Sequence, residues 1–367
     1  MKNRFILMLL SITSATMAIV ILFILFGSTE KTYGFDKNSS VYEKMNHKKA
    51  ISYLVIGDSI GRGSGTENPA MRWFKILERR FFIEDAIRLK GDYIVQSGAT
   101  AFEGLYKLTS HKENRPVDLI FFVFGENDRK YMQAGEFGHL YESLMRQAKT
   151  LHPNAELITI TESSLTFDDF AKQIAAITGH YQAASIDMRP VFQASGYTAE
   201  ELTRDLVHPN EKGYQLYSDT IYSKLWENAS NNKKPAILPP PLYEDSFLGF
   251  QEVMKPDRLD GFVPKGSFLE SHHTGAVLEY EFSGSLVGAK VLRGPDGGIF
   301  NVYIDDKFIT SLSTWWPFEK ERSLYIASSL ADGPHNIRIE VSERKSPYTK
   351  TAKSFIRISS IISNKTE

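Results

Sequence analysis

The chain has 367 residues, of which 42% are hydrophobic and 24% charged, so its composition is that of a folded protein and its length suits two domains. Its formal net charge of −1 gives no reason to expect nucleic acid as a partner. The complete lack of cysteine excludes disulfides, thiol catalysis and cysteine-ligated metals, so the core alone must stabilise the fold.

The first 27 residues form a candidate membrane anchor. Two basic residues precede Phe5 to Phe26, an uncharged stretch long enough to cross a hydrocarbon core of about 30 Å. A cleavable signal peptide has a shorter apolar region and a small-x-small site, which Ser28-Thr29-Glu30 matches poorly, although a cleaved and secreted chain is the alternative. Since basic residues before a span stay cytoplasmic, the rest of the chain should be extracytoplasmic, beginning with a polar stalk at residues 28–48.

Alternating strand and helix patterns predict an α/β domain at residues 49–228. Ile51 to Ile56 and Asp118 to Phe124 are apolar runs typical of strands buried on both faces, and a glycine follows each run. Strands separated by helices form a parallel sheet with helices on both faces. Further strands are predicted at 93–95, 156–161 and 185–188, and helices at 71–89, 137–151, 167–181 and 210–226.

The composition changes at Ala229. The prolines of residues 229–245 prevent a helix or a central strand there and predict a semi-rigid linker. Residues 246–367 contain short strands separated by Gly, Pro and Asp turns, which is typical of a β-sandwich. These strands are predicted at 275–282, 286–292, 299–304, 308–311, 323–327, 335–341 and 354–362.

A serine follows the first predicted strand in the segment Gly57-Asp58-Ser59. Open α/β sheets bind ligands at the carboxyl ends of their strands, where this serine should lie. Serine is a weak nucleophile unless a base removes its proton, so a catalytic role requires a partner. The alternative is a simple strand-to-helix turn, because Asp and Ser are also good helix caps.

The segment Asp205-Leu206-Val207-His208 can supply that base. A carboxylate three residues before a histidine can accept a hydrogen bond from the ring Nδ1–H, which leaves Nε2 free to take a proton. A surface or helix-capping histidine is the structural alternative.

Two further segments follow predicted strands. In Gly125-Glu126-Asn127-Asp128, the neutral Asn127 amide can donate to a developing oxyanion without acting as a base. In Ser97-Gly98-Ala99, the glycine lets a backbone N–H approach a ligand closely. Each segment alone also fits an ordinary turn.

Together and in this order, the four segments resemble the SGNH/GDSL hydrolase superfamily over about residues 49–228. The resemblance implies a three-layer α/β/α, flavodoxin-like domain that needs no cofactor and no metal. It implies that Ser59 is the nucleophile, His208 the general base and then acid, and Asp205 the carboxylate that orients the imidazole.

The same resemblance implies an oxyanion hole formed by the backbone N–H groups of Ser59 and Gly98 and the side chain of Asn127. Glu126 departs from the small or hydroxyl residue that usually stands between the glycine and the asparagine. This departure puts the local acyl pocket in doubt, but not the role of the amide.

The β-rich region resembles the jelly-roll domains attached to some carbohydrate esterases of this superfamily, through residues 275–280 and 301–306. Trp315-Trp316, in a predicted loop, would stack on sugar rings or else be one buried and one exposed aromatic. His272-His273 has neither the i, i+4 spacing nor the nearby carboxylates of a metal site.

These observations predict a membrane-anchored, extracytoplasmic serine esterase that removes O-acyl groups, in the first place acetyl, from a cell-envelope polysaccharide. The same triad would serve an O-acetyltransferase, a lipid esterase or a thioesterase. A glycan-binding surface protein with a vestigial triad is the alternative outside enzymes. The sequence gives no indication of the oligomeric state.

Overall fold

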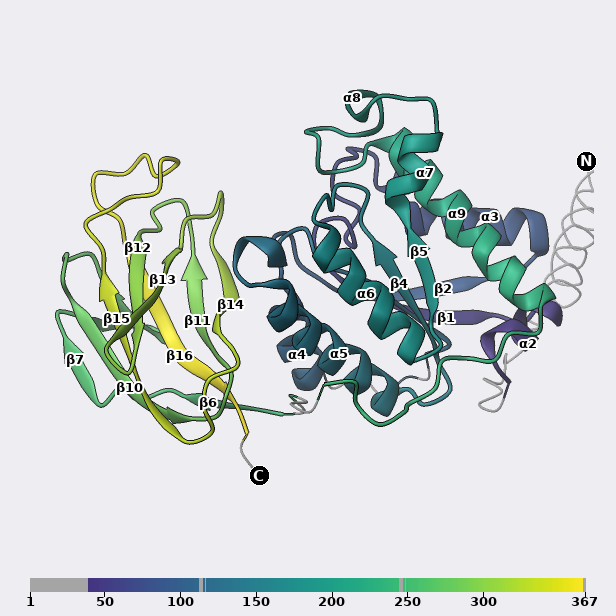
Figure 1. Cartoon of the computed structure of the whole chain (residues 1–367). Helices are drawn as coiled ribbons and strands as arrows, with labels where there is room; N and C mark the ends of the chain where they lie inside the picture. Colours follow the sequence, from purple (N-terminus) through teal and green to yellow (C-terminus); the bar gives the residue numbers. More distant parts are fainter. Residues whose placement is uncertain (1–38, 112–114, 116, 244–246, 248, 366–367) are drawn as a thin grey trace, which may run out of the picture. The chain divides into compact units, whose positions relative to one another are not determined.

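The computed structural model describes residues 39–111, 115, 117–243, 247 and 249–365, which form an α/β domain followed by an all-β domain (Figure 1). The predicted membrane anchor and most of the predicted stalk lie outside these residues. In the part of the chain that the structure describes, no helix combines the length and the apolar character needed to cross a bilayer.

A parallel five-stranded sheet forms the centre of the α/β domain, with strand order β2-β1-β3-β4-β5. Strands β1 and β3 are buried along their whole length, as their apolar runs predict, and β4 is buried as well. The strands are β1 (Ile51–Gly57), β2 (Leu89–Val95), β3 (Leu119–Val123), β4 (Glu156–Thr161) and β5 (Ala184–Asp187).

Helices cover both faces of the sheet and complete the three layers that the sequence predicts (Figure 1). One face packs against α4 (Ala101–Ser110), α5 (Ala134–Leu151) and α6 (Asp168–His180). The other packs against α2 (Val41–Asn46), α3 (Trp73–Asp85) and α9 (Glu211–Ser230). Short helices lie at η1 (Pro69–Met71), η2 (Asp128–Lys130), α7 (Met188–Ala194) and α8 (Ala199–Leu202).

Helix α2 corrects the predicted stalk, whose last residues belong to the folded domain. Ser40 caps the helix, accepting the N–H of Glu43 while the Glu43 carboxylate accepts the N–H of Ser40. Tyr42 and Met45 are buried in the core cluster that includes α9, and Lys44 Nζ lies 2.6 Å from Asp118 Oδ1. The polar composition of residues 28–48 therefore hides a short amphipathic helix.

The helix predicted at residues 71–89 ends earlier than its apolar pattern indicates. Ala86 takes a left-handed conformation (φ 59°), which ends α3 at Asp85, and β2 begins at Leu89. Helix α4 is absent from the sequence prediction, although Thr100 and Glu103 have the spacing of a capping box. The helix contains a glycine, and in the structure the Thr100 side chain forms no capping hydrogen bond.

Helix α9 extends to Ser230, two residues into the predicted linker, whose composition therefore does not prevent a helix at its start. The other described residues of the linker contain no helix or strand, and they are bound to the α/β domain. Lys233 Nζ lies 2.8 Å from the buried Glu156 carboxylate, and the backbone N–H groups of Leu242 and Tyr243 donate to Glu142 of α5 at 2.6 and 2.9 Å. The segment therefore runs as a strap across this domain.

The second domain is the predicted β-sandwich, with two antiparallel sheets around a separate apolar core. One sheet has the order β13-β12-β15-β10-β7 and the other β14-β11-β16-β9-β8, with β6 paired to β16. The strands are β6 (Phe250–Val253), β7 (Arg258–Asp260), β8 (Val263–Lys265), β9 (Phe268–Ser271), β10 (Val277–Ser283), β11 (Val287–Arg293), β12 (Ile299–Ile304), β13 (Lys307–Ser313), β14 (Lys320–Ala327), β15 (Pro334–Val341) and β16 (Ile356–Asn364).

The two domains share buried contacts and belong to one compact unit. Arg322 of β14 and Glu103 of α4 are each 1% exposed and lie 2.7 Å apart, with Arg322 Nε also donating to both carboxylate oxygens. An apolar cluster joins Phe102 and Leu105 of α4 to Tyr325 of β14. The β domain is therefore packed against the α/β domain through a buried interface.

Candidate active site

The four sequence segments meet at the carboxyl edge of the parallel sheet. Ser59 follows β1 and the segment Gly125–Asp128 follows β3, while Gly98 lies between β2 and α4. Strands β1 and β3 are neighbours, and a Cβ added to Gly57 would lie 3.0 Å from the Val123 carbonyl oxygen. Glycine at position 57 therefore permits the close turn that brings Ser59 to this edge.

Ser59, His208 and Asp205 form a continuous chain of hydrogen bonds. The distance from His208 Nε2 to Ser59 Oγ is 2.9 Å, and that from His208 Nδ1 to Asp205 Oδ2 is 2.8 Å. A carboxylate only accepts hydrogen bonds, so Nδ1 carries the proton and Nε2 accepts the Ser59 hydroxyl. The structure thus brings together the three side chains that the sequence selects.

Asp205 reaches the imidazole through a tight fold-back of its own segment. Its Oδ1 accepts the backbone N–H groups of His208 (2.8 Å) and Val207 (3.2 Å), and Leu206 takes a left-handed conformation with φ 67°. Burial opposes ionisation of Asp205, but these N–H donors and the imidazole outweigh it and lower the pKa of the carboxyl. Asp205 is therefore an anion that both holds and polarises His208.

The loop after Ser59 packs closely against the segment that contains His208. A Cβ added to Gly65 would lie 2.3 Å from the Pro209 carbonyl oxygen and 2.9 Å from His208 Cβ. The Tyr214 hydroxyl of α9 donates to the Ser64 carbonyl, and Asn210 caps α9 by accepting the N–H groups of Lys212 and Gly213. These contacts hold the loop after Ser59 against the segment that contains His208.

Three N–H donors lie in the segments expected to form the oxyanion hole. Among the described residues, none accepts a hydrogen bond from the backbone N–H of Ser59 or of Gly98. The side-chain Nδ2 of Asn127 donates to Asp58 Oδ2 at 2.6 Å. Because an amide nitrogen carries two hydrogens, Asn127 retains a second N–H for a ligand.

The β domain places Trp316 beside Gly98. A Cβ added to Gly98 (φ 72°) would lie 3.3 Å from the Trp316 ring carbon Cη2. The guanidinium groups of Arg293 and Arg322 lie 4.8 and 5.3 Å from the centroid of that ring. The preceding Trp315 packs on Tyr348 instead, with 4.8 Å between ring centroids. The stacking of these tryptophans on sugar remains a prediction.

Buried carboxyl groups below the triad were not selected from the sequence. Burial raises the pKa of Asp58 to about 6 and that of Asp128 to about 7, and it raises the pKa of Glu162 well above its usual range. Asp128 Oδ1 accepts the N–H of Ala101 at 2.7 Å and its Oδ2 that of Gly125 at 3.1 Å, which ties α4 to the loop after β3. Glu162 directly follows β4, where a glutamate resembles an ordinary loop residue.

Glu126, which departs from the resemblance, is tied to its own segment. Its carboxylate binds Arg129, with Nη2 and Oε1 2.5 Å apart, and is only 3% exposed. Its backbone N–H donates to Glu162 Oε2 at 2.7 Å. The ion pair neutralises a charge that would otherwise oppose an anion at Asn127.

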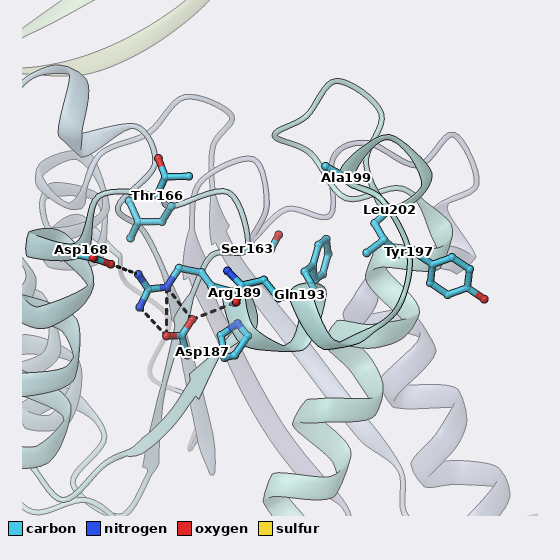
Figure 2. A pocket seen from close by; sticks show the side chains of 12 residues that line it. Ser163, Thr166, Asp168, Asp187, Arg189, Gln193, Tyr197, Ala199 and Leu202 are labelled. Atoms are coloured by element: carbon cyan, nitrogen blue, oxygen red, sulfur yellow. Dashed lines mark hydrogen bonds and ion pairs between the residues drawn. The ribbon is translucent and has the colours of Figure 1, made fainter.

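A hollow of about 710 Å³ lies beside the loop after β4 and helix α7 (Figure 2). Its wall contains Leu165, whose side chain lies against Gly125, and Leu202, whose carbonyl accepts the N–H of Asn210 at 2.9 Å. Figure 2 shows the Arg189 guanidinium joined to Asp187 and Asp168, with Tyr197 at one side. The lining of this hollow includes none of the residues Ser59, Gly98, Asn127, Asp205 and His208.

A carboxylate, an imidazole and a serine hydroxyl joined in this order, at the edge of a parallel sheet, are the groups of a serine hydrolase. Residues 55–216 match the sequence model of the GDSL-like Lipase/Acylhydrolase family. A comparison with curated proteins finds no match.

Solved structures extend the similarity over both domains. A crystal structure described as a two-domain esterase (CEX) active on acetylated mannans has 15% identity and a TM-score of 0.67, covering 87% of this chain and 92% of the other. A second, described as co-crystallised with mannopentaose, has 16% identity and a TM-score of 0.68, covering 89% and 94%. At this identity the likeness establishes a common two-domain fold.

An acetyl xylan esterase from Geobacillus stearothermophilus, solved as a single-residue variant, is similar over a smaller part of the chain. It has 16% identity and a TM-score of 0.42, and the match covers 48% of this chain and 94% of the other.

Proposed function

We propose that this protein is an extracytoplasmic esterase that removes O-acyl groups, in the first place acetyl, from a cell-envelope polysaccharide. The observation that carries the proposal is the unbroken chain from Ser59 Oγ through His208 to Asp205, with distances of 2.9 and 2.8 Å. This geometry activates a hydroxyl that is otherwise a weak nucleophile.

In the acylation step, Ser59 Oγ attacks the ester carbonyl while His208 Nε2 takes the hydroxyl proton. Asp205 stabilises the imidazolium that forms. The carbonyl oxygen becomes an anion and receives the N–H groups of Ser59 and Gly98 and the free N–H of Asn127. When the tetrahedral intermediate collapses, His208 returns the proton to the departing sugar oxygen, which leaves an acyl group on Ser59.

In the deacylation step, His208 removes a proton from water, whose oxygen attacks the acyl-serine carbonyl. The same donors stabilise the second tetrahedral intermediate. Its collapse releases the carboxylic acid, and the proton returns from His208 to Ser59 Oγ. A sugar hydroxyl in place of water would give transfer of the acyl group, so the ratio of the two products decides between an esterase and an O-acetyltransferase.

Two observations support a glycan as the carrier of the ester. The hollow beside helix α7 combines aromatic Phe192 and Tyr197 with polar Gln193 and Arg189, a mixture suited to sugar rings and hydroxyls. The two-domain fold is similar to that of an esterase described as active on acetylated mannans. A lipid esterase or thioesterase would instead prefer long acyl chains in a series of 4-nitrophenyl esters.

The proposed cellular location is based on the uncharged segment Phe5 to Phe26 and the basic residues before it. As an anchor it would hold the catalytic domain on the outer side of the membrane, where envelope polysaccharides lie. Protease accessibility of the catalytic domain in intact cells tests this part of the proposal.

The decisive experiment is mass spectrometry of the full chain after brief exposure to an acetylated polysaccharide. We expect an acetyl adduct on the peptide that contains Ser59, and a loss of 4-nitrophenyl acetate hydrolysis of about 10⁶-fold in Ser59→Ala. An adduct on another residue, or an undiminished rate in a folded Ser59→Ala variant, would remove Ser59 as the nucleophile.

A further inference from the structure

Arg293, the last residue of β11, is a buried cation in the β domain, with only 8% of its surface exposed. Among the described residues, none accepts a hydrogen bond from its buried Nε and none forms an ion pair with its guanidinium. Burial, followed by the like charge of Arg322, lowers the pKa of Arg293 to about 10, so the side chain is still charged at neutral pH. A buried charge in this state is poorly compensated.

The buried carboxylate of this region, Glu103, already binds two other cations. Arg322 lies 2.7 Å and Lys107 lies 2.9 Å from its oxygens. Arg293 therefore brings an excess of positive charge to this part of the interface.

Two more donors beside Arg293 are buried and have no described acceptor, Arg322 Nη1 and Trp316 Nε1. Both guanidinium groups lie against the Trp316 ring, and the Trp316 backbone N–H donates to the carbonyl of Gly294 at 2.9 Å. Guanidinium and indole nitrogens donate hydrogen bonds and do not accept them. All three donors therefore require an acceptor that the described residues do not supply.

These donors lie beside the glycine of the expected oxyanion hole. A Cβ added to Gly98 would lie 3.3 Å from Trp316 Cη2 and 3.8 Å from Arg322 Nη1. At the preceding residue, Ser97, the hydroxyl oxygen accepts a hydrogen bond from Arg62 Nη1 at 3.3 Å, and Arg62 forms no ion pair with any described acid. Arginines of both domains therefore lie at the loop that is expected to bind the acyl oxygen.

A hollow of about 450 Å³, also lined by Arg322, extends the excess of cations. Its wall includes Gln96, two residues before Gly98 in the chain. Its lysine and arginine side chains outnumber its carboxylates by four to two: Lys107, Lys290, Lys320 and Arg322 against Glu103 and Glu321. A polymer with repeated anionic groups matches this arrangement better than a single small anion does.

We propose that Arg293, Arg322 and Trp316 form a site for an anionic group of the substrate, so that the polysaccharide is acidic and carries a carboxylate or phosphate group near its ester. A guanidinium can donate in parallel to two oxygens of either group and neutralise its charge. A neutral sugar hydroxyl would satisfy one donor but leave the charge of Arg293 unbalanced. The inference rests on the proposed esterase function and names the class of its substrate.

Binding of polymers that differ in the anionic group tests the site. Polygalacturonate and its methyl ester address a carboxylate, and phosphomannan and its dephosphorylated form address a phosphate. By isothermal titration calorimetry with the native full chain, we expect the charged member of one pair to bind about 10-fold more tightly or better. Arg293→Met should remove this preference. Arg258→Met, in β7 of the other sheet, is the matched control and should retain it.

The pair that shows the preference identifies the group as carboxylate or phosphate. Equal binding of the charged and neutral members in both pairs would overturn the inference, and so would an undiminished preference in a folded Arg293→Met variant. If Arg293→Met does not fold, the preference of the native chain decides the question.

This readout is separate from the proposed function, because binding is measured without ester hydrolysis. O-acetylated forms of the same polymers then serve as substrates. A chain that hydrolyses none of them, nor 4-nitrophenyl acetate, would refute the esterase, whereas the binding preference would still decide whether the anion site exists. An active esterase that binds charged and neutral polymers equally would refute the inference alone.

Discussion

Asp205 accepts hydrogen bonds from two kinds of donor, backbone N–H groups and the His208 imidazole, and this determines the effect expected of its substitution. One oxygen accepts backbone N–H groups of its own turn, and the other accepts His208 Nδ1–H at 2.8 Å. An amide in its place still accepts the backbone N–H groups through its oxygen, so the turn persists. Its NH₂ group, however, faces Nδ1 as a donor.

Asp205→Asn should therefore impose the wrong imidazole tautomer, in which Nε2 carries the proton and cannot accept the one from Ser59. We expect kcat to fall about 10⁴-fold, with little change in KM or in melting temperature. Steady-state kinetics together with thermal unfolding check both parts. A folded variant that retains a tenth of the native kcat would contradict the assigned role.

The sequence selects the reacting side chains more readily than the groups that support them. Ser59, Asn127 and His208 stand in short segments whose order along the chain is itself informative. Glu162 has no such signal, because a single glutamate after a strand is indistinguishable from a solvated loop residue. Only the folded structure shows that it is completely buried and that it accepts the backbone N–H of Glu126.

At the scale of elements, the serine loop and the histidine segment are fixed to each other by close packing at Gly65. This residue has φ 111°, a conformation that side chains of L-residues rarely adopt, and an added Cβ would meet Pro209 and His208.

Gly65→Ala should push the histidine segment away from Ser59. A displacement of about 1 Å at the base lowers the rate on the order of 10²-fold, so we expect a kcat loss of this size. Gly275→Ala is the matched control, because Gly275 also has positive φ (80°) but an added Cβ there would meet nothing within 4 Å. Equal rates in the two variants would argue against a role for the close packing at Gly65.

Most of the longer strands and helices are predicted at the right place, with ends that differ by up to four residues, and weak elements are missed. Strand β4 is predicted at 156–161 and forms there, because the segment is rich in β-branched Ile and Thr, which favour strands. Strands β7 and β8 are three residues each and exposed, so they show no alternation to detect. Helix α2 is missed because its six residues are too few to show a helical hydrophobic pattern.

At the scale of the whole molecule, a buried ion pair joins the two domains. Burial opposes the charge on Glu103, but Arg322 and Lys107 outweigh it and lower the pKa of this carboxyl. Both partners of the Glu103–Arg322 pair are 1% exposed, so removing one leaves the other charge without compensation in the interior.

Glu103→Ala should therefore lower the free energy of unfolding by about 3–5 kcal/mol, measured by urea denaturation. Asp169→Ala, which removes an ion pair with partners 76% and 81% exposed, is the control and should leave stability unchanged. Replacing Glu103 and Arg322 together with leucine should restore much of the loss. A single-variant loss no larger than that of the control would contradict a buried interface.

This interface limits how such an enzyme can evolve. Domains joined by flexible linkers can be exchanged between genes with little loss of stability, because neither domain needs the other to cover its surface. Here a replacement β domain would need a cation opposite Glu103 and apolar side chains that cover Phe102 and Leu105. Recombination at the proline-rich linker should therefore yield few folded hybrids. Substitutions at the interface in one domain should be accompanied by compensating substitutions in the other.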